Sequence, residues 1–402
     1  MRLSRRQSLW LAFGAGSWIL GCSPREAASS SRLAAVQRAI ARGCQWLEGQ
    51  AHPDGTWRSE TYGALKDPMA LTPAVIKALV FRPGERLQET PCAKGLDFLA
   101  RTIHEGDSAP RSPYPVYCAA LSALALESAS RREGAPPSWR TAAAGWRAEL
   151  VRHSLDESLG WTEADPAYGG FGYSPAPPKK GARSHYDADL SSTLFALGSL
   201  RYAGAHLDVT ERARKFVLRC QNLPLAIGAA PGPKDDGGFF FTPTRAEQNK
   251  AGGERRDETG RTRFDSYGTM TADGLRALLR LGYAPDHPRV VAALRWIAAR
   301  LDRSDITLPP GDFEPAREGE RFGARFYWCW SLAHSMGACA RAGLTEPFGR
   351  GVAERLLDAL LDLQEPGGSY RNAYTFVMED DPLVATPMAL AALQLAAAAL
   401  PA

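Results

Sequence analysis

The sequence predicts an all-α protein in which six helix pairs form a closed (α/α)6 toroid. The first observation is a repeated pattern: an amphipathic helix ending near a glutamine, a glycine-rich turn with an aromatic residue, and then an apolar helix. The second is that residues 67–73 and 381–387, near opposite ends of the chain, share the pattern Asp-Pro-x-x-x-Thr-Pro. Repeats of this length are supersecondary units that bury their apolar faces only against one another. We therefore expect the two similar segments to be neighbours where the ring closes.

The first helix of each pair is expected on the outside of the ring, because it carries Arg, Lys or Glu on one face. Three of these helices are followed by Gln50, Gln221 and Gln364, whose amides can bond to unpaired backbone groups at a helix end. Glycine in the next turn allows the positive φ that a tight turn needs. The turns are at residues 54–57, 168–173, 236–239 and 367–370, and the outer-helix anchors are Trp46-Leu47, Phe98-Leu99, Trp146, Phe216-Val217, Trp296-Ile297 and Leu360-Leu361.

The second helix of each pair is apolar on nearly all faces, which is typical of a buried helix. Strict alternation makes all inner helices run in one direction, so their N-termini and positive dipole ends meet at one mouth of the ring. A long connection at about 224–266 lies at the same mouth. We expect a lid or binding loop there, and the alternative for its central part is a disordered insertion. The inner helices are expected at residues 73–80, 116–126, 190–200, 270–281, 327–342 and 383–395.

Residues 1–22 are typical of an export signal. Twin arginines at residues 5 and 6 precede an apolar stretch from Leu9 to Leu20, which is short for a membrane span. Residues 19–22 resemble the lipobox of bacterial lipoproteins, with Cys22 as the lipidated residue. We expect a lipoprotein of the cell envelope, exported by the twin-arginine route and tethered to the membrane through a flexible segment at residues 23–31. The alternative is an ordinary cleaved signal peptide.

Residues 32–402 are expected to form a single domain, because no shift in composition divides them. The net charge of +4 on 402 residues is small and evenly spread, so we expect no nucleic-acid partner. The cysteines after Cys22 form no C-x-x-C pair and are expected to be small core residues. They are Cys44, Cys92, Cys118, Cys220, Cys329 and Cys339.

The segment from Arg42 to Trp57 resembles the QW motif of squalene and oxidosqualene cyclases, with one residue fewer before its glutamine. The chain from residue 32 is similar to the group of toroid proteins that contains these terpenoid cyclases and the β subunits of protein prenyltransferases. This resemblance implies an α/α toroid, an apolar isoprenoid or triterpenoid ligand, and no cofactor for cyclase chemistry. The motif is structural in that group, so it predicts the fold more directly than the reaction. Squalene-hopene cyclases differ in having two barrels and no export signal.

Class II cyclases of this group protonate their substrate with the middle Asp of a D-x-D-D motif. Asp187 matches the first Asp and Asp189 the middle one, whereas Leu190 replaces the third. The resemblance therefore implies acid catalysis by Asp189 with Asp187 beside it. The alternative is that these residues cap the helix that follows. Capping would lower the pKa of the carboxyl group and oppose its use as an acid.

The prenyltransferase branch implies a zinc ion held by Asp, Cys and His. Cys329 is present, but Tyr327 replaces the Asp and Ala385 stands near the position of the His. His334 is five residues from Cys329 on one expected helix, so the two side chains point to different faces. We therefore expect no metal site.

Aromatic residues near the starts of the inner helices are candidates for lining a central cavity, where they would stabilise carbocations. For any single residue the alternative is an ordinary core or turn position. The expected cavity residues are Tyr186, Tyr267, Tyr327, Trp328, Trp330 and Phe171.

Together these features predict a lipid-anchored toroid that binds an apolar ligand, with acid chemistry through Asp189. One alternative is a non-catalytic binding or scaffold lipoprotein. Another is a carbohydrate-active α/α-barrel enzyme, which would need two carboxylates facing each other across the cavity. The candidates for such a pair are Asp189 with Asp235, Asp236, Asp380 or Asp381.

Overall fold

The computed structural model describes residues 24–80, 90–103, 112–181, 188–202, 204, 206–226, 229–232, 234–301, 305–344 and 348–400. The export signal, Cys22, Tyr186 and Asp187 lie outside the described residues. None of the helices in the described ranges combines the length and hydropathy of a membrane span.

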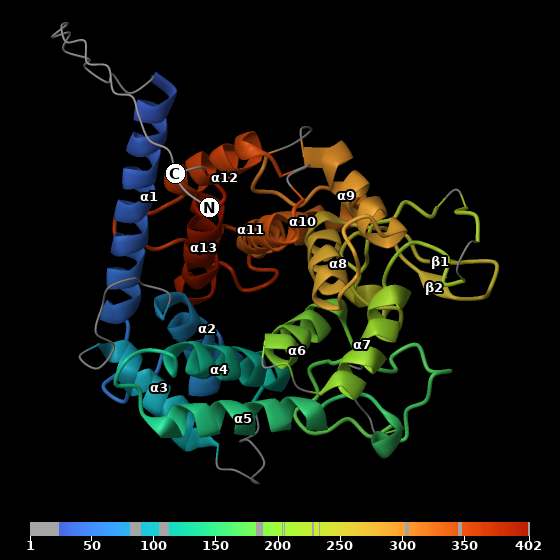
Figure 1. Cartoon of the computed structure of the whole chain (residues 1–402), viewed down its shortest axis with the longest axis horizontal. Coiled ribbons are helices and arrows are strands. Elements are labelled where there is room, and N and C mark those ends of the chain that lie inside the picture. Colours follow the sequence, from blue (N-terminus) through green and yellow to red (C-terminus); the bar gives the residue numbers. More distant parts are fainter. Residues whose placement is uncertain are drawn as a thin grey trace, which may run out of the picture.

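Six inner helices surround a common centre, and each contacts the next until the last contacts the first (Figure 1). Six outer helices lie on the periphery and pack against them. The predicted all-α toroid of six helix pairs is therefore confirmed. The inner helices are α2 (Pro68–Leu79), α4 (Pro115–Ala129), α6 (Leu190–Tyr202), α8 (Gly268–Arg280), α11 (Arg325–Arg341) and α13 (Pro382–Ala397). The outer helices are α1 (Pro24–Gly49), α3 (Pro91–Thr102), α5 (Pro137–Arg152), α7 (Leu207–Arg219), α9 (Pro288–Leu301) and α12 (Arg350–Asp362).

The ring closes between α13 and α2, as the similar Asp-Pro segments predict. The side chains of Asp67 and Asp381 cap these two helices by accepting the N–H groups of Met69 and Leu383 at 2.8 and 2.9 Å. Proline occupies the first turn of both helices, where its missing N–H costs nothing. The Ser59 hydroxyl also donates to Asp381, so the two ends of the chain are joined by hydrogen bonds as well as by packing.

Two of the three glutamines that follow outer helices, Gln221 and Gln364, connect neighbouring repeats, whereas Gln50 is exposed. The Gln221 amide donates to the carbonyls of Gly237 and Arg289, both at 3.0 Å. The Gln364 amide does the same with Gly368 at 2.9 Å and, across the closure of the ring, with Ala39 at 2.8 Å. The acceptors are therefore a turn carbonyl and a carbonyl of the next outer helix, whereas we expect groups at a helix end from the sequence.

A second repeated contact joins the aromatic residue of each of four turns to a threonine of the following inner helix. In each case the aromatic residue's backbone N–H donates to the threonine Oγ1 at 3.0 to 3.1 Å. All eight residues are fully buried, so each bond satisfies a backbone donor that water cannot reach. The pairs are Trp57 with Thr72, Phe171 with Thr193, Phe239 with Thr271, and Tyr370 with Thr386.

The long connection at 224–266 lies against the N-terminus of α6, at the mouth where the sequence places it. Leu190 donates its N–H to the Phe241 carbonyl at 2.8 Å, and the Thr242 hydroxyl donates to the Ala188 carbonyl at 2.6 Å. The connection also contains a short antiparallel hairpin of β1 (Arg255–Arg256) and β2 (Thr262–Arg263). Its central part is therefore structured, and the alternative of a disordered insertion is wrong there. The remaining helix, α10 (Glu318–Gly323), precedes α11.

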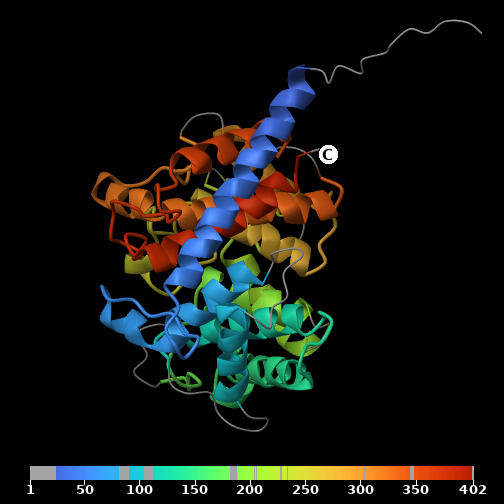
Figure 2. The same ribbon diagram turned by 90° about the vertical axis from the view of Figure 1, so that its left-hand side faces the viewer.

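The N-terminal segment also differs from the expectation. Residues 24–31, for which the sequence predicts a flexible tether, form the first turns of α1. Figure 2 shows α1 along the side of the ring, with its N-terminal end projecting beyond it. The segment contains Ala27 and Ala28, which favour helix, and it continues directly into the amphipathic outer helix. All six described cysteines are buried, as expected for small core residues.

The aromatic–threonine contacts predict a specific loss of stability. Replacing Thr271 by Val preserves the shape of the side chain but leaves the buried Phe239 N–H without an acceptor. An unsatisfied buried donor costs about 1–3 kcal/mol, so the free energy of unfolding in urea should fall by that amount. The matched control is Thr61→Val at an exposed position, where the change should stay within about 0.5 kcal/mol. Equal effects of the two substitutions would contradict the role given to the contact.

Candidate functional site

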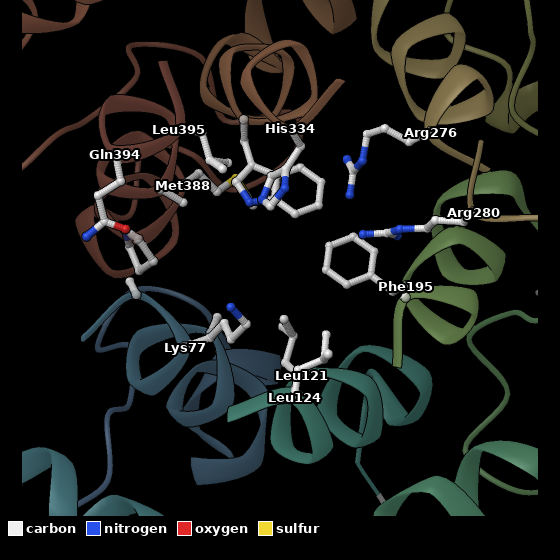
Figure 3. A pocket seen from close by; sticks show the side chains of 16 residues that line it. Lys77, Leu121, Leu124, Phe195, Arg276, Arg280, His334, Met388, Gln394 and Leu395 are labelled. Carbon is white, nitrogen blue, oxygen red and sulfur yellow. The ribbon is translucent and has the colours of Figure 1, made fainter. Parts of the chain in front are cut away.

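A cavity of about 340 Å³ lies at the centre of the ring, and all six inner helices contribute to its wall. Most of the wall is apolar. Figure 3 shows the labelled side chains around the centre of the ring. The apolar part includes Leu121 and Leu124 from α4, Phe195 from α6, Trp330 from α11, and Met388 and Leu395 from α13.

Three basic side chains point into this apolar cavity. Lys77 is in the last turn of α2, and Arg276 and Arg280 are one turn apart on the same face of α8. Figure 3 shows the Lys77 amine and both guanidinium groups directed toward the centre. Among the described residues that line the cavity, none is acidic.

Each arginine is held by contacts at the wall. Arg276 donates to Asp273 at 2.9 Å in an ion pair whose two side chains are almost completely buried. Its guanidinium also lies 4.5 Å from the centre of the Trp330 ring, a cation–π distance. Arg280 donates to the Leu194 carbonyl at 3.1 Å. These contacts fix where positive charge is presented to the cavity.

Burial and mutual repulsion set the protonation states of these groups. Burial, with a further contribution from Arg280, lowers the pKa of Lys77 to about 7. Burial and the neighbouring Arg276 lower the pKa of Arg280 to about 9, so this guanidinium keeps its proton at neutral pH. His334 also lines the cavity, and burial and Arg276 hold its pKa well below 6.5, so the imidazole is neutral.

The cavity is bounded on one side by a hydrogen-bonded group that we call the polar layer: Tyr117, Tyr173, Ser191, Tyr327 and Asp273. Tyr117 donates to Ser191 at 2.7 Å and lies 3.1 Å from the Tyr173 hydroxyl oxygen. Ser191 also bonds to the hydroxyl of Tyr327, which donates to Asp273 at 2.7 Å.

The polar layer is nearer to the N-termini of the inner helices than the cavity is. On α4, α6, α8 and α11 its residues precede a lining residue of the same helix by three or four positions, about one turn. The cavity therefore belongs to the middle and C-terminal parts of the inner helices. Most of the aromatic residues expected to line a central cavity do not line this one.

Of the expected cavity aromatics, Trp330 lines the cavity. Tyr327 belongs to the polar layer and stacks on Trp330 with ring centres 5.7 Å apart. Phe171, Tyr267 and Trp328 are fully buried and do not line the cavity. Trp328, for example, donates its indole N–H to the Ile306 carbonyl at 2.8 Å. Packing between helix layers, which the sequence does not specify, decides which aromatic faces the centre.

Asp189 immediately precedes α6 and caps it. Its two carboxyl oxygens accept the N–H and the hydroxyl of Ser192, both at 2.7 Å. The side chain is buried and does not line the cavity. Burial raises the pKa of Asp189 to about 7. Both capping hydrogen bonds lower this pKa, as expected of a cap, but burial outweighs them. Acid catalysis by Asp189 stays a prediction.

The carboxylates suggested for a glycosidase pair have other partners. Asp235 forms an ion pair with Arg263, and Asp236 accepts the indole N–H of Trp296 at 2.9 Å. Asp380 accepts the Tyr62 hydroxyl at 2.6 Å, and Asp381 caps α13. None of them lines the cavity. Within the described part of the chain, no group of three His, Cys, Asp or Glu residues is placed to hold a metal ion.

Sequence reasoning did not single out Lys77, Arg276 or Arg280. The available signal is a basic residue within an otherwise apolar inner helix, as at Lys77, and a pair of arginines spaced by one turn on α8. This pattern identifies a cavity residue only when it is known which side of each helix faces the centre, because a basic residue on a helix normally faces solvent.

No protein-family model matches the chain, and no curated protein is detectably similar to it in sequence. Solved structures do share its fold. A variant of the type II terpene cyclase MstE from Scytonema, in complex with geranylgeranyl dihydroxybenzoate, has a TM-score of 0.54 and 16% identity over 92% of this chain and 100% of the other. The GH76A α-1,6-mannanase from a Salegentibacter species has a TM-score of 0.57 and 12% identity over 90% of this chain and 99% of the other. At these identities the likeness shows the fold, and it confirms the α/α toroid to which the sequence resemblance points.

The low proton affinity of Lys77 predicts a pH-dependent stability. Between its folded pKa of about 7 and its unfolded value of 10.5, the unfolded chain binds more protons, so stability rises with pH. Replacing Lys77 by Met removes this contribution. The stability difference, variant minus wild type, should be largest near pH 7 and shrink toward about pH 9.5 in urea unfolding.

The exposed Lys94→Met is the matched control, because an exposed ammonium group is solvated in both states. Its stability difference should not change over this range. A difference for Lys77→Met that is equally constant would show that Lys77 is not buried in the way described.

Proposed function

We propose that the protein binds in its central cavity an apolar small molecule that carries a negatively charged group, such as an isoprenoid acid. The observation that carries this proposal is the combination of a largely apolar wall with three inward-pointing basic groups and no acidic lining residue among those described. The cavity volume of about 340 Å³ is within the range of small-molecule sites.

The charge balance favours an anion. Asp273 is paired with Arg276, whereas Arg280 donates to the uncharged Leu194 carbonyl, so the positive charge of Arg280 remains in the cavity. Charge held away from water costs free energy unless it is paired. A carboxylate or phosphate on the ligand would supply that partner, and the apolar wall would cover the rest of the molecule.

The likeness to MstE supports a ligand of the same class. MstE is seen with geranylgeranyl dihydroxybenzoate, which joins an isoprenoid chain to an acid. A ligand of this class suits the cavity. The proposal does not extend to cyclase chemistry, because Asp189 caps a helix and does not line the cavity. The likeness to the mannanase supports a toroid, but the mostly apolar wall of this cavity does not suit a carbohydrate.

Binding predicts a charge-dependent effect at Arg280. Replacing Arg280 by Gln should weaken binding of farnesoic acid by about 10- to 100-fold, because a hydrogen bond to a charged group contributes about 1.5–3 kcal/mol. Binding of farnesol, which has the same chain without the charge, should change much less. Isothermal titration with the full-length protein measures both ligands.

The control for this experiment is Arg355→Gln on the outer helix α12, away from the cavity. It should leave the affinities for both molecules unchanged. If neither farnesoic acid nor farnesol binds the wild type, the isoprenoid proposal fails and a scaffold role becomes the better account.

We also propose that the protein is exported and anchored to the membrane by a lipid on Cys22, as the sequence around that residue suggests. Replacing Cys22 by Ser should then move the protein from the membrane fraction to the soluble fraction of the cell envelope and abolish labelling with palmitate. The control is Cys44→Ser, which changes a buried cysteine and should leave the anchoring intact. Unchanged membrane association of the Cys22 variant would overturn the anchor.

A further inference from the structure

Lys77 differs from the other basic residues of the cavity in its chemistry. An arginine can bind an anion but stays protonated, whereas a lysine that loses its proton becomes a nucleophile. Figure 3 shows the Lys77 amine directed into the same space as the guanidinium groups of Arg276 and Arg280. An anion held by the arginines would therefore share the cavity with a potential nucleophile.

The groups that face Lys77 come from several helices of the ring. α4 and α13, which flank α2, contribute uncharged lining residues. α8 contributes Arg276 and Arg280, and α11 contributes the neutral His334. Arg341, at the end of α11, adds positive charge that also lowers the pKa of His334. The C-terminal dipole of α2 favours a protonated amine, but burial and the like charge of Arg280 outweigh it and hold the pKa of Lys77 near 7.

We propose that Lys77 is a reactive amine that forms a reversible imine with the carbonyl group of an anionic ligand held by Arg276 and Arg280. This inference rests on the proposed function for the anion and extends it to a ligand that carries an aldehyde or ketone. A lysine desolvated in an apolar pocket beside another cation is one of the known ways to activate this nucleophile.

Imine formation needs only the Lys77 amine and the carbonyl group of the ligand. The Nζ lone pair adds to the carbonyl carbon, and the oxygen takes up a proton released by the nitrogen, which gives a carbinolamine. Loss of the hydroxyl group with the second nitrogen proton releases one water molecule and leaves the C=N bond. His334, neutral and on the same cavity wall, is placed among the groups that can carry these protons.

The test uses pyridoxal phosphate, which combines an aldehyde with an anionic group, and pyridoxal, which lacks the phosphate. The full-length protein is treated with each compound and with borohydride, which reduces an imine to a stable amine, and the labelled peptides are identified by mass spectrometry. The chain has eight lysines, so each can be followed separately.

We expect Lys77 to be labelled by pyridoxal phosphate at least about tenfold faster than the exposed Lys66 and Lys94, because far more of its amine is unprotonated at pH 7. Pyridoxal should react with Lys77 about tenfold more slowly than pyridoxal phosphate, and Arg280→Gln should remove most of this difference. Lys250 is the internal control. Its pKa is also lowered by burial, but it does not line the cavity, so pyridoxal phosphate and pyridoxal should label it at about the same rate.

Two variants separate the amine from the charge. Lys77→Arg keeps a cation and should lose labelling while still binding farnesoic acid. If that variant does not fold, as judged by its circular dichroism, Lys77→Met serves in its place. Labelling of Lys77 no faster than of Lys94, or equal labelling by the two compounds, overturns the inference.

The outcomes also separate this inference from the proposed function. Binding of farnesoic acid without selective labelling of Lys77 would overturn the imine and leave the binding proposal standing. Selective labelling without binding of farnesoic acid would support the imine and overturn the isoprenoid ligand.

Discussion

The structure depends on closure of the ring. The inner helices are apolar on nearly every face, so each must be covered by two inner neighbours and by the outer helices. An open arc of the same helices would expose α2 and α13 along their full length. Packing of α13 on α2, with the Gln364 link between the last repeat and α1, removes those two edges. The first and last repeats are thus as necessary as any other, although they are farthest apart in sequence.

Closure also explains how basic side chains can be held at the centre of an apolar ring. The six inner helices leave a space at their common centre, and this space is the cavity. Asp273 supports the charged wall from the side of the polar layer, since it accepts from both Arg276 and Tyr327. The repeated turn contacts fix the starts of four inner helices relative to the turns before them. The scaffold and the site are therefore built from different residues of the same helices.

The architecture could be predicted from the sequence because it depends on local patterns: alternating helix types, glycine turns and the paired Asp-Pro segments. The site could not, because it depends on helix rotation. Lys77 and Trp330 face the centre whereas Trp328, two positions from Trp330, faces an outer loop. The raised pKa of Asp189 could not be predicted either, because the sequence indicates a helix cap at this position but not its complete burial. The helical start of α1 at residues 24–31 could not be predicted either, because a segment of Ala and Ser suits a linker as well as a helix.

The N-terminal helix also bears on how the molecule would stand at a surface. α1 has 26 residues and is therefore about 39 Å long at 1.5 Å per residue. It begins at Pro24, two positions after Cys22. If Cys22 carries a lipid, the bilayer would hold the end of a stiff rod that is itself part of the ring wall. Only Ser23 would then separate the lipidated residue from this helix, so the ring would stay close to the membrane surface.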